Sequence, residues 1–564
     1  MPAVKSSASA PKPPSRGAAN QRAVNSSAEA TASLTPELVI ALCGPIGSPL
    51  HETAEQICNA LREHRYTCEN IRLSDLIKIN ATKVDVAIDS SSRFKEIKSL
   101  INAGDKLRQK FGNDVLAKLA IAKISGDRQD NLGEISDAAN ENRKSGGKNI
   151  RGYRFCHIID SIKNDAELDL LRLIYGDALL SIGVFSTIET RRENLSQPGA
   201  FSENEIDDLV DTDSGEEFAH GQSVRNTFPR CDFFLRVDHA AHSPEESDAI
   251  PQILKKLRRL FSLIFQSSII TPNPEEAAMY ASASAARNSA CLSRQVGAAV
   301  TSSTGELLAV GWNDVPQKGG GLYGKPPITH EIIHPTKDQR CFALPRGACF
   351  NDREKDSILQ AIVDSLVKVK LIDSNQILSA KEAIRDNTRV KDLIEFSRAI
   401  HAEMHAILTA SRIAGERLVG GKIFVTTYPC HSCARHIVAA GINEIYYIEP
   451  YRKSMATKLH SDTLSERADD QKKVRLLQFD GVAPRRFIEL FEAGDRKKNG
   501  VLSLPRRSDA QPTTKVSLKA IPRLEQAVVA EVTEKELNFP ALAVAKPGSD
   551  DHGNEPQSPT PSAA

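Results

Sequence analysis

HAEMHAILTASRIAGERLVGGKIFVTTYPCHSC, residues 401–433, decides the fold of the carboxyl-terminal half of this chain. Its apolar spacing predicts a helix over 401–414, a strand over 422–426 and a second helix over 430–440. A further short strand is expected over 444–448. Short apolar runs that alternate with helical patterns are typical of a mainly parallel sheet covered by helices. We therefore expect both helices to begin at the same edge of an α/β sheet.

Three potential metal ligands lie at these two helix starts. Cys430 and Cys433 are three residues apart, so their thiols share one helix face, and His401 opens the other helix. One imidazole and two thiolates leave the fourth position of a tetrahedral zinc ion to water, as in catalytic sites. Glu403 suits a base better than a ligand. The alternative is a closed structural site, whose fourth ligand would be one of three nearby histidines: His405, His431 or His436.

The order and spacing of these residues, with a proline before the first cysteine, resemble the zinc-binding motif of the cytidine and deoxycytidylate deaminases. The resemblance implies that His401, Cys430 and Cys433 bind Zn²⁺. It also implies that Glu403 carries protons from water to N3 of the pyrimidine and then to the departing amine. A three-layer α/β/α deaminase-like domain is expected over 272–500.

A hairpin is expected from the strands 296–300 and 306–310, followed by Gly311, Trp312 and Asn313. This segment resembles the first hairpin of deoxycytidylate deaminases, in which the asparagine touches the sugar, so the resemblance makes Asn313 a substrate-binding residue. An asparagine that ends a strand in an Asx turn is an equally good interpretation.

Other polar residues of this half have alternative interpretations. His405 stands where members of the family often carry an asparagine, and Arg287 and Arg294 are candidate phosphate contacts. The long polar insertion before His401 contains further potential ligands of a second metal, although loop residues without a shared role are the simpler interpretation: His330, His334, Cys341 and Cys349.

The amino-terminal half, 36–265, begins with a buried strand, a glycine turn and a helix. Gly44, Gly47 and Ser48 in this turn resemble the start of a phosphate-binding loop, and Asp160 ends a later apolar strand. The resemblance implies a P-loop kinase-like parallel-sheet domain in which these four residues bind a nucleotide or its phosphates. The lysine of a full loop is missing, so phosphoryl transfer is not expected. A glycine turn that only packs strand against helix is the alternative.

A degraded kinase-like domain fused to a deoxycytidylate-type deaminase resembles the bacterial anti-phage dCTP deaminases. The resemblance implies conversion of dCTP, and often dCMP, to dUTP or dUMP with release of ammonia, which depletes the nucleotide pool. It also implies control by the amino-terminal domain, a homo-oligomer and, in some members, an inhibitory small RNA. The alternatives are a housekeeping dCMP deaminase, a nucleic-acid editing deaminase and a non-catalytic nucleotide-sensing switch.

Composition limits these alternatives. The 564 residues are 40% hydrophobic, and 73 Lys and Arg are balanced by 72 Asp and Glu. This balance, with 5% aromatic residues, argues against the basic, aromatic channel of an editing enzyme. No apolar run approaches the ~20 residues of a membrane helix and no signal sequence is recognised, so the cytoplasm is expected. We expect disordered tails over 1–35 and 507–564, although the apolar residues near 530 are able to dock.

Overall fold

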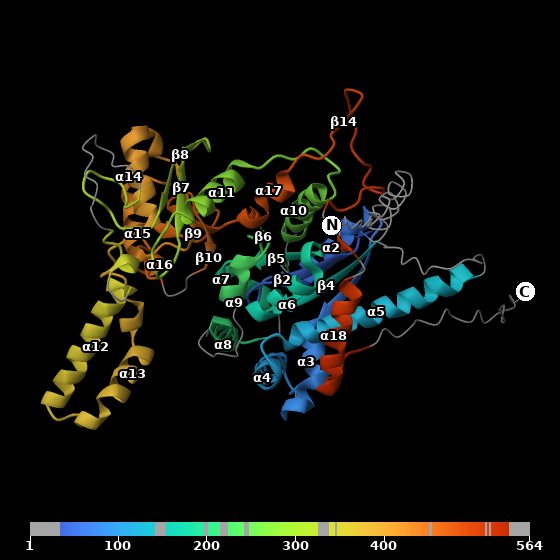
Figure 1. The fold of residues 1–564 in the computed structure, drawn as a ribbon, viewed down its shortest axis with the longest axis horizontal. Coiled ribbons are helices and arrows are strands. Elements are labelled where there is room, and N and C mark those ends of the chain that lie inside the picture. Colours follow the sequence, from blue (N-terminus) through green and yellow to red (C-terminus); the bar gives the residue numbers. More distant parts are fainter. Residues whose placement is uncertain are drawn as a thin grey trace, which may run out of the picture.

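The structure is a computed structural model, and Figure 1 shows two α/β halves lying side by side. It describes the following residues: 34–140, 154–196, 201–214, 224–241, 248–324, 338–344, 347–450, 454–513, 516–517 and 520–540.

The amino-terminal half is built on a six-stranded sheet of order β13-β6-β5-β2-β4-β3. Its strands are β2 (Leu38–Cys43), β3 (Thr67–Arg72), β4 (Phe155–Ile162), β5 (Leu179–Phe185), β6 (Phe233–Arg236) and β13 (Gly481–Val482). The first five are parallel, and β13 runs antiparallel to β6. The predicted parallel sheet is confirmed, whereas its kinase-like interpretation stays a prediction.

Helices cover both faces of this sheet because successive strand residues point to opposite sides. Ile40 and Leu42 pack with α2 and α10, whereas Val39 and Ala41 pack with α5 and α6. The helices of this half are α2 (Leu50–Arg62), α3 (Leu73–Asn80), α4 (Arg93–Phe111), α5 (Val115–Asn140), α6 (Asp165–Tyr175), α7 (Ile188–Leu195), α8 (Glu203–Ser214), α9 (Val224–Thr227) and α10 (Ala249–Ile264).

The second sheet has the order β11-β12-β10-β9-β7-β8. Its strands are β7 (Gly297–Thr301), β8 (Leu307–Trp312), β9 (Lys422–Thr427), β10 (Glu444–Glu449), β11 (Leu464–Ser465) and β12 (Val474–Gln478). The hairpin β7–β8 is antiparallel, and β7 also runs antiparallel to β9. The strands β9, β10, β12 and β11 are parallel to one another. The strands predicted around 422–426 and 444–448 are therefore confirmed.

Helices enclose the second sheet in three layers. Ala299 and Phe424 pack with α11 on one face, and Ala298 and Val300 share a core with α14 and α15 on the other. The helices of this half are α11 (Pro274–Ala286), α14 (Ala402–Ala414), α15 (His431–Ala439), α16 (Ala456–Leu459) and α17 (Phe487–Phe491). The three-layer arrangement predicted for this half is present.

The insertion between β8 and α14 contains a helical hairpin, α12 (Phe350–Lys368) and α13 (Ile377–Asn387). Figure 1 shows this hairpin projecting away from both sheets. The sequence of the insertion predicts only a long polar segment, so these two helices were not predicted. No helix in the described ranges is both long and apolar enough to cross a membrane.

Both predicted tails need correction where the structure describes them. Leu34–Thr35 form β1, which pairs antiparallel with β16 (Val516–Ser517). The helix α18 (Ile521–Glu534) follows and packs against α5, so the prediction of disorder from 507 onward is wrong over this helix. Burial of Val528 and Val532 explains the docking. Residues 1–33 and 541–564 lie outside the described residues.

The carboxyl-terminal region also returns to the first sheet. After β12, Gly481 and Val482 pair with Phe234 and Phe233 of β6. A short hairpin, β14 (Lys497–Lys498) and β15 (Val501–Leu502), comes later. The predicted 272–500 unit therefore supplies one strand to the amino-terminal sheet, and the two halves share backbone hydrogen bonds.

Candidate metal centre

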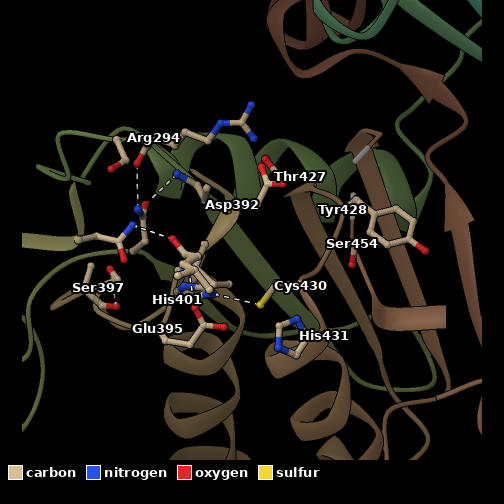
Figure 2. Close-up of a pocket in the computed structure, with 18 of the residues that line it drawn as sticks. Arg294, Asp392, Glu395, Ser397, His401, Thr427, Tyr428, Cys430, His431 and Ser454 are labelled. Atoms are coloured by element: carbon tan, nitrogen blue, oxygen red, sulfur yellow. Dashed lines mark hydrogen bonds between the residues drawn. The ribbon is translucent and has the colours of Figure 1, made fainter. Parts of the chain in front are cut away.

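His401, Cys430 and Cys433 bring their ligand atoms together, all within 4.8 Å of one another. His401 Nδ1 lies 3.2 Å from Cys433 Sγ and 3.5 Å from Cys430 Sγ. A tetrahedral zinc with ordinary bond lengths holds a nitrogen and a sulfur roughly 3.5 Å apart, so these separations fit that ion. Figure 2 shows the contact between His401 and Cys430. Among the described residues, this is the one group with such geometry.

Two helix starts position these side chains. His401 is the residue before α14, and Cys430 is the residue before α15, with β9 between the helices. Cys430 Sγ accepts a hydrogen bond from the backbone N–H of Cys433 (3.4 Å), as expected of a residue that caps a helix. The positive ends of both helix dipoles therefore meet at the three ligands, where they favour thiolates.

The electrostatics of the two thiols favour a bound cation. The hydrogen bond between the thiols, helped by His401, lowers the pKa of Cys430 to about 4. The same contact and burial raise the pKa of Cys433 well above its usual range. The hydrogen bond to Cys430 raises the pKa of His401 to about 9. Only one of the two thiols therefore ionises readily by itself, and a divalent metal is the natural partner that allows both to bind as thiolates.

Glu403 lies in the first turn of α14, beside the ligands but outside their group. Its side chain is buried, with the residue 4% exposed, and burial raises its pKa above the usual range. The residue also lines a cavity of about 770 Å³ that His401 and Cys430 share. A carboxyl group in this position is able to hold and release a proton next to a substrate in the cavity.

Asn313 lies at the wall of the same cavity, at the end of β8. Its Oδ1 accepts the backbone N–H of Val296 (2.8 Å), and its Nδ2 donates to the backbone oxygen of Arg294 (2.8 Å). These bonds tie the end of β8 to the residues before β7, and they are not the local bond of an Asx turn. The structure thus brings Asn313 to the predicted site, and contact with a sugar stays a prediction.

The three candidate fourth ligands lie outside the ligand group. His405 packs edge-to-face against Trp312, with ring centroids 4.7 Å apart. His436 Nδ1 lies 2.6 Å from the backbone oxygen of Ser432, within its own helix. His431 lines the cavity without joining the ligands. The described side chains therefore leave the fourth coordination position free for water or substrate.

The second metal site considered for the insertion is not formed by its described members. Cys341 and Cys349 belong to no metal-binding group among the described residues. His330 and His334 lie outside the described residues. Of the two candidate phosphate contacts, Arg294 lines the cavity and Arg287 does not.

The predicted phosphate loop lies at a second cavity, of about 620 Å³, in the amino-terminal half. Gly47, Ser48 and Asp160 line it, whereas Gly44 does not. The amide of Ser48 donates to the oxygen of Pro45 (3.0 Å), so this N–H is used inside the loop. Asp160 is 1% exposed and its Oδ2 contacts His51. Nucleotide binding by these residues stays a prediction.

The sequence analysis missed two residues of the 770 Å³ cavity. Arg225 comes from α9 in the amino-terminal half, and Arg389 from the segment before α14. Neither belongs to a motif, and Arg225 lies far from His401 in sequence. No local sequence signal identifies them, because Arg225 reaches the site only through the packing of the two halves and Arg389 only through the fold of the insertion before α14.

Comparison with known proteins identifies this region. Residues 272–449 match the family described as "Cytidine and deoxycytidylate deaminase zinc-binding region". Over 56 residues, 10% of the chain, the sequence is 48% identical to ComE operon protein 2 of Bacillus subtilis (strain 168), of which it spans 29%. Over 168 residues, 30% of the chain, it is 29% identical to the deoxycytidylate deaminase of Enterobacteria phage T4, of which it spans 74%.

Two solved structures of the dCMP deaminase from cyanophage S-TIM5 are also similar. The apo form is 17% identical and covers 37% of this chain and 100% of its own, with a TM-score of 0.20. The form in complex with dCMP and dUMP is 20% identical and covers 37% of this chain and 99% of its own, with a TM-score of 0.21. The family match and the His/Cys/Cys geometry together support Zn²⁺ as the cofactor.

Proposed function

We propose that this chain, whose residues 272–449 form a zinc-binding region of the cytidine and deoxycytidylate deaminase family, removes the 4-amino group of a deoxycytidine nucleotide. The substrate is dCMP, dCTP or both, and water supplies the oxygen that replaces the amine. The observation that carries the proposal is the buried Glu403 carboxyl beside a three-ligand metal group, inside a cavity. A catalytic site needs the open fourth position that this group leaves.

The residues of the chain divide the chemistry between them. When bound, Zn²⁺ supplies Lewis acidity that lowers the pKa of water to about 7. His401, Cys430 and Cys433 hold the ion. Glu403 takes a proton from water and delivers it to N3 of the base as the water oxygen bonds to C4. It then takes the second proton from that oxygen and passes it to the amine as the C4–N bond breaks and the C4 carbonyl forms. Ammonia and the uracil nucleotide are the products, so atoms and charges balance without an oxidant or reductant.

The burial of Glu403 supports this role. A carboxyl group with a raised pKa holds a proton more readily than an exposed one, and it is able to return that proton to a leaving group. A glutamate exposed to water would exchange protons with solvent instead. The family match supports the same assignment, because in zinc deaminases the conserved glutamate is the general acid and base rather than a ligand.

The proposed biological role follows from the sequence resemblance to anti-phage dCTP deaminases. In this role the enzyme depletes deoxycytidine nucleotides in the cytoplasm, acts as a homo-oligomer and is controlled by the amino-terminal half or by an inhibitory small RNA. Mass spectrometry of nucleotide pools, in cells that express the chain or its Glu403→Gln variant during phage infection, tests this role. Equal pools in the two strains contradict it.

A second proposed function is nucleotide binding in the amino-terminal half. Asp160 supports it, because its buried Oδ1 has no hydrogen-bond partner among the described residues and the side chain lines the 620 Å³ cavity. Ligands of open α/β sheets bind beyond the carboxyl ends of the strands, where strand order reverses, and β2 occupies that place here. Equilibrium binding of ATP with Mg²⁺, compared with the Asp160→Asn variant, tests it.

Ammonia release from purified, zinc-loaded protein tests the main proposal. We expect ammonia and a uracil product from dCMP, dCTP or both, with no product from the metal-free chain. Zinc retention without turnover of any deoxycytidine compound contradicts the proposal and favours a non-catalytic nucleotide-sensing switch.

A further inference from the structure

We propose that Arg225, from the amino-terminal half, and Arg389, from the segment before α14, bind the phosphate groups of the substrate. The two halves of the chain then build one substrate site. This inference rests on the proposed deoxycytidine nucleotide substrate and adds to it the residues that recognise the phosphates.

The cavity that holds the metal ligands is lined by both halves. Most lining residues belong to the deaminase region, but Arg225 reaches the cavity from α9. The chain continues from α9 into a short 3-10 helix, Phe228–Arg230, which packs against β10. Because β10 neighbours β9 in the second sheet, α9 lies where the amino-terminal half meets the metal centre.

One end of the cavity holds the metal centre. His401, Cys430 and the Glu403 carboxyl line it together. This end suits the neutral cytosine ring and the ion. The phosphates of a nucleotide need cationic groups elsewhere in the cavity, and arginine is well suited because its planar fork matches phosphate oxygens.

Three arginines line the cavity, and their partners differ. Arg294, 46% exposed at its side chain, donates to Glu449 Oε1 at 2.5 Å, so a carboxylate already neutralises it. Arg389 contacts the Met455 sulfur at 3.6 Å, and among the described residues no carboxylate lies within 4.0 Å of it. A thioether does not neutralise a guanidinium, so Arg389 keeps its charge for a ligand.

The segment that carries Arg389 also carries acids, which makes Arg225 necessary. Asp392 and Glu395 line the same cavity, and Glu395 Oε2 accepts the backbone N–H of Ile394 (2.8 Å). Arg389 alone does not outnumber these acids. Arg225 brings a second guanidinium into the cavity from the amino-terminal half, so both halves supply groups that match phosphate oxygens.

The test is equilibrium binding of dCMP and of deoxycytidine to the full-length, zinc-loaded Glu403→Gln chain, which does not consume the ligands. In this background Arg225→Gln and Arg389→Gln should each weaken dCMP binding about 10- to 100-fold, as expected for losing a hydrogen bond to a charged group. Deoxycytidine has no phosphate, so its affinity should stay within about twofold. Arg225→Lys should give an intermediate loss, since it keeps the charge and loses the fork.

The matched control is Arg62→Gln, an exposed arginine of α2 that does not line the cavity. It should leave the binding of both ligands unchanged. Unchanged dCMP affinity in Arg225→Gln, or an equal loss for dCMP and deoxycytidine, overturns the inference. Zinc content and urea unfolding verify that each variant is folded. Ammonia release by the wild-type chain tests the proposed function separately. Each of the two proposals can therefore fail while the other stands.

Discussion

The backbone N–H of Trp312 donates a hydrogen bond to Nδ1 of His405, over 3.2 Å. This bond ties α14, which carries Glu403, to the end of β8, which leads into Asn313. Burial lowers the pKa of His405, so the imidazole stays neutral and keeps the lone pair that accepts the bond. His405 therefore positions the hairpin against the helix and does not bind the metal.

This arrangement predicts the metal content of histidine and cysteine variants. His405→Asn should keep about one zinc per chain, because the ligand group does not include it. Cys430→Ser and Cys433→Ser should each lose most of their zinc, since a hydroxyl is a poor replacement for a thiolate ligand. Elemental analysis after dialysis against a weak chelator measures this. Loss of zinc from His405→Asn would show that the site is closed by a fourth protein ligand.

Replacement of Glu403 separates metal binding from catalysis. Glu403→Gln keeps the size of the side chain but removes its ability to carry a proton. We expect turnover of dCMP to fall ~10²-fold or more, with zinc content and substrate affinity nearly unchanged. Steady-state kinetics and metal analysis on the same preparation measure both quantities. A variant that keeps wild-type turnover would remove Glu403 from the mechanism.

Close contact between β8 and α14 predicts a strong effect at Gly311. A Cβ added there would lie 2.4 Å from the Ala406 nitrogen and 2.5 Å from the Ala402 oxygen. Both are backbone atoms of the helix that carries Glu403, so the helix has to move. Gly311→Ala should cost about 1–3 kcal/mol of stability, as overpacking does, and lower activity together with it.

A second glycine provides the control for this substitution. An added Cβ at Gly126, in α5, meets nothing within 4 Å, so Gly126→Ala should leave stability unchanged or raise it by up to ~1 kcal/mol. Urea unfolding of both variants, with activity measured in parallel, compares them. Equal stability of the two variants would contradict the tight packing of α14 on β8.

The sequence predicted the metal centre because its signal is local. His401, Glu403, Cys430 and Cys433 stand at fixed spacings around one strand, and a parallel sheet brings the carboxyl ends of its strands to one edge. The α/β alternation likewise predicted β2 and β4 of the first sheet and β7 to β10 of the second, but it did not predict β3, β11 or β12. Such patterns need no knowledge of how distant parts of the chain pack.

The parts that the sequence did not predict depend on contacts between distant segments. Arg225 reaches the cavity only because the two halves meet, and β13 joins the first sheet only after the second sheet is complete. The tail from 507 looked too polar to fold by itself, but α18 buries an apolar face against α5. Composition indicates how much apolar surface a segment buries by itself. It does not indicate how much apolar surface the segment buries when it packs against another part of the chain.

A buried ion pair between α18 and α5 predicts that α18 contributes to the stability of the protein. Glu525 in α18 is 0% exposed and binds Arg128 of α5 through two hydrogen bonds, of 3.0 and 3.1 Å. Arg128 also contacts Glu37, next to β2. Arg128 keeps Glu37 as a partner in Glu525→Ala but loses two buried hydrogen bonds to a charged group, which should cost about 1–3 kcal/mol. The exposed Glu534→Ala in the same helix should cost less than ~0.5 kcal/mol in urea unfolding. Similar losses of unfolding free energy in the two variants would show that the buried ion pair does not stabilise the docking of α18 on α5.

His51 and Asp160 predict a pH-dependent contribution to stability in the amino-terminal half. The hydrogen bond to Asp160 raises the pKa of His51, against the opposing effects of burial and of Arg72, while Glu52 adds a smaller favourable charge. A raised folded-state pKa means that the stabilisation is fully present below the unfolded value, ~6.5, and is lost as pH rises through the folded value.

His51→Asn should therefore lower the melting temperature more at about pH 5.5 than at about pH 9. The exposed His239→Asn serves as the control and should show no such difference between the two pH values. Calorimetry of the zinc-loaded proteins at both pH values measures the difference. A larger loss at the higher pH would reverse the sign and show that His51 is neutral beside Asp160, with its ring N–H donating a hydrogen bond to the carboxylate instead of pairing with it as a cation.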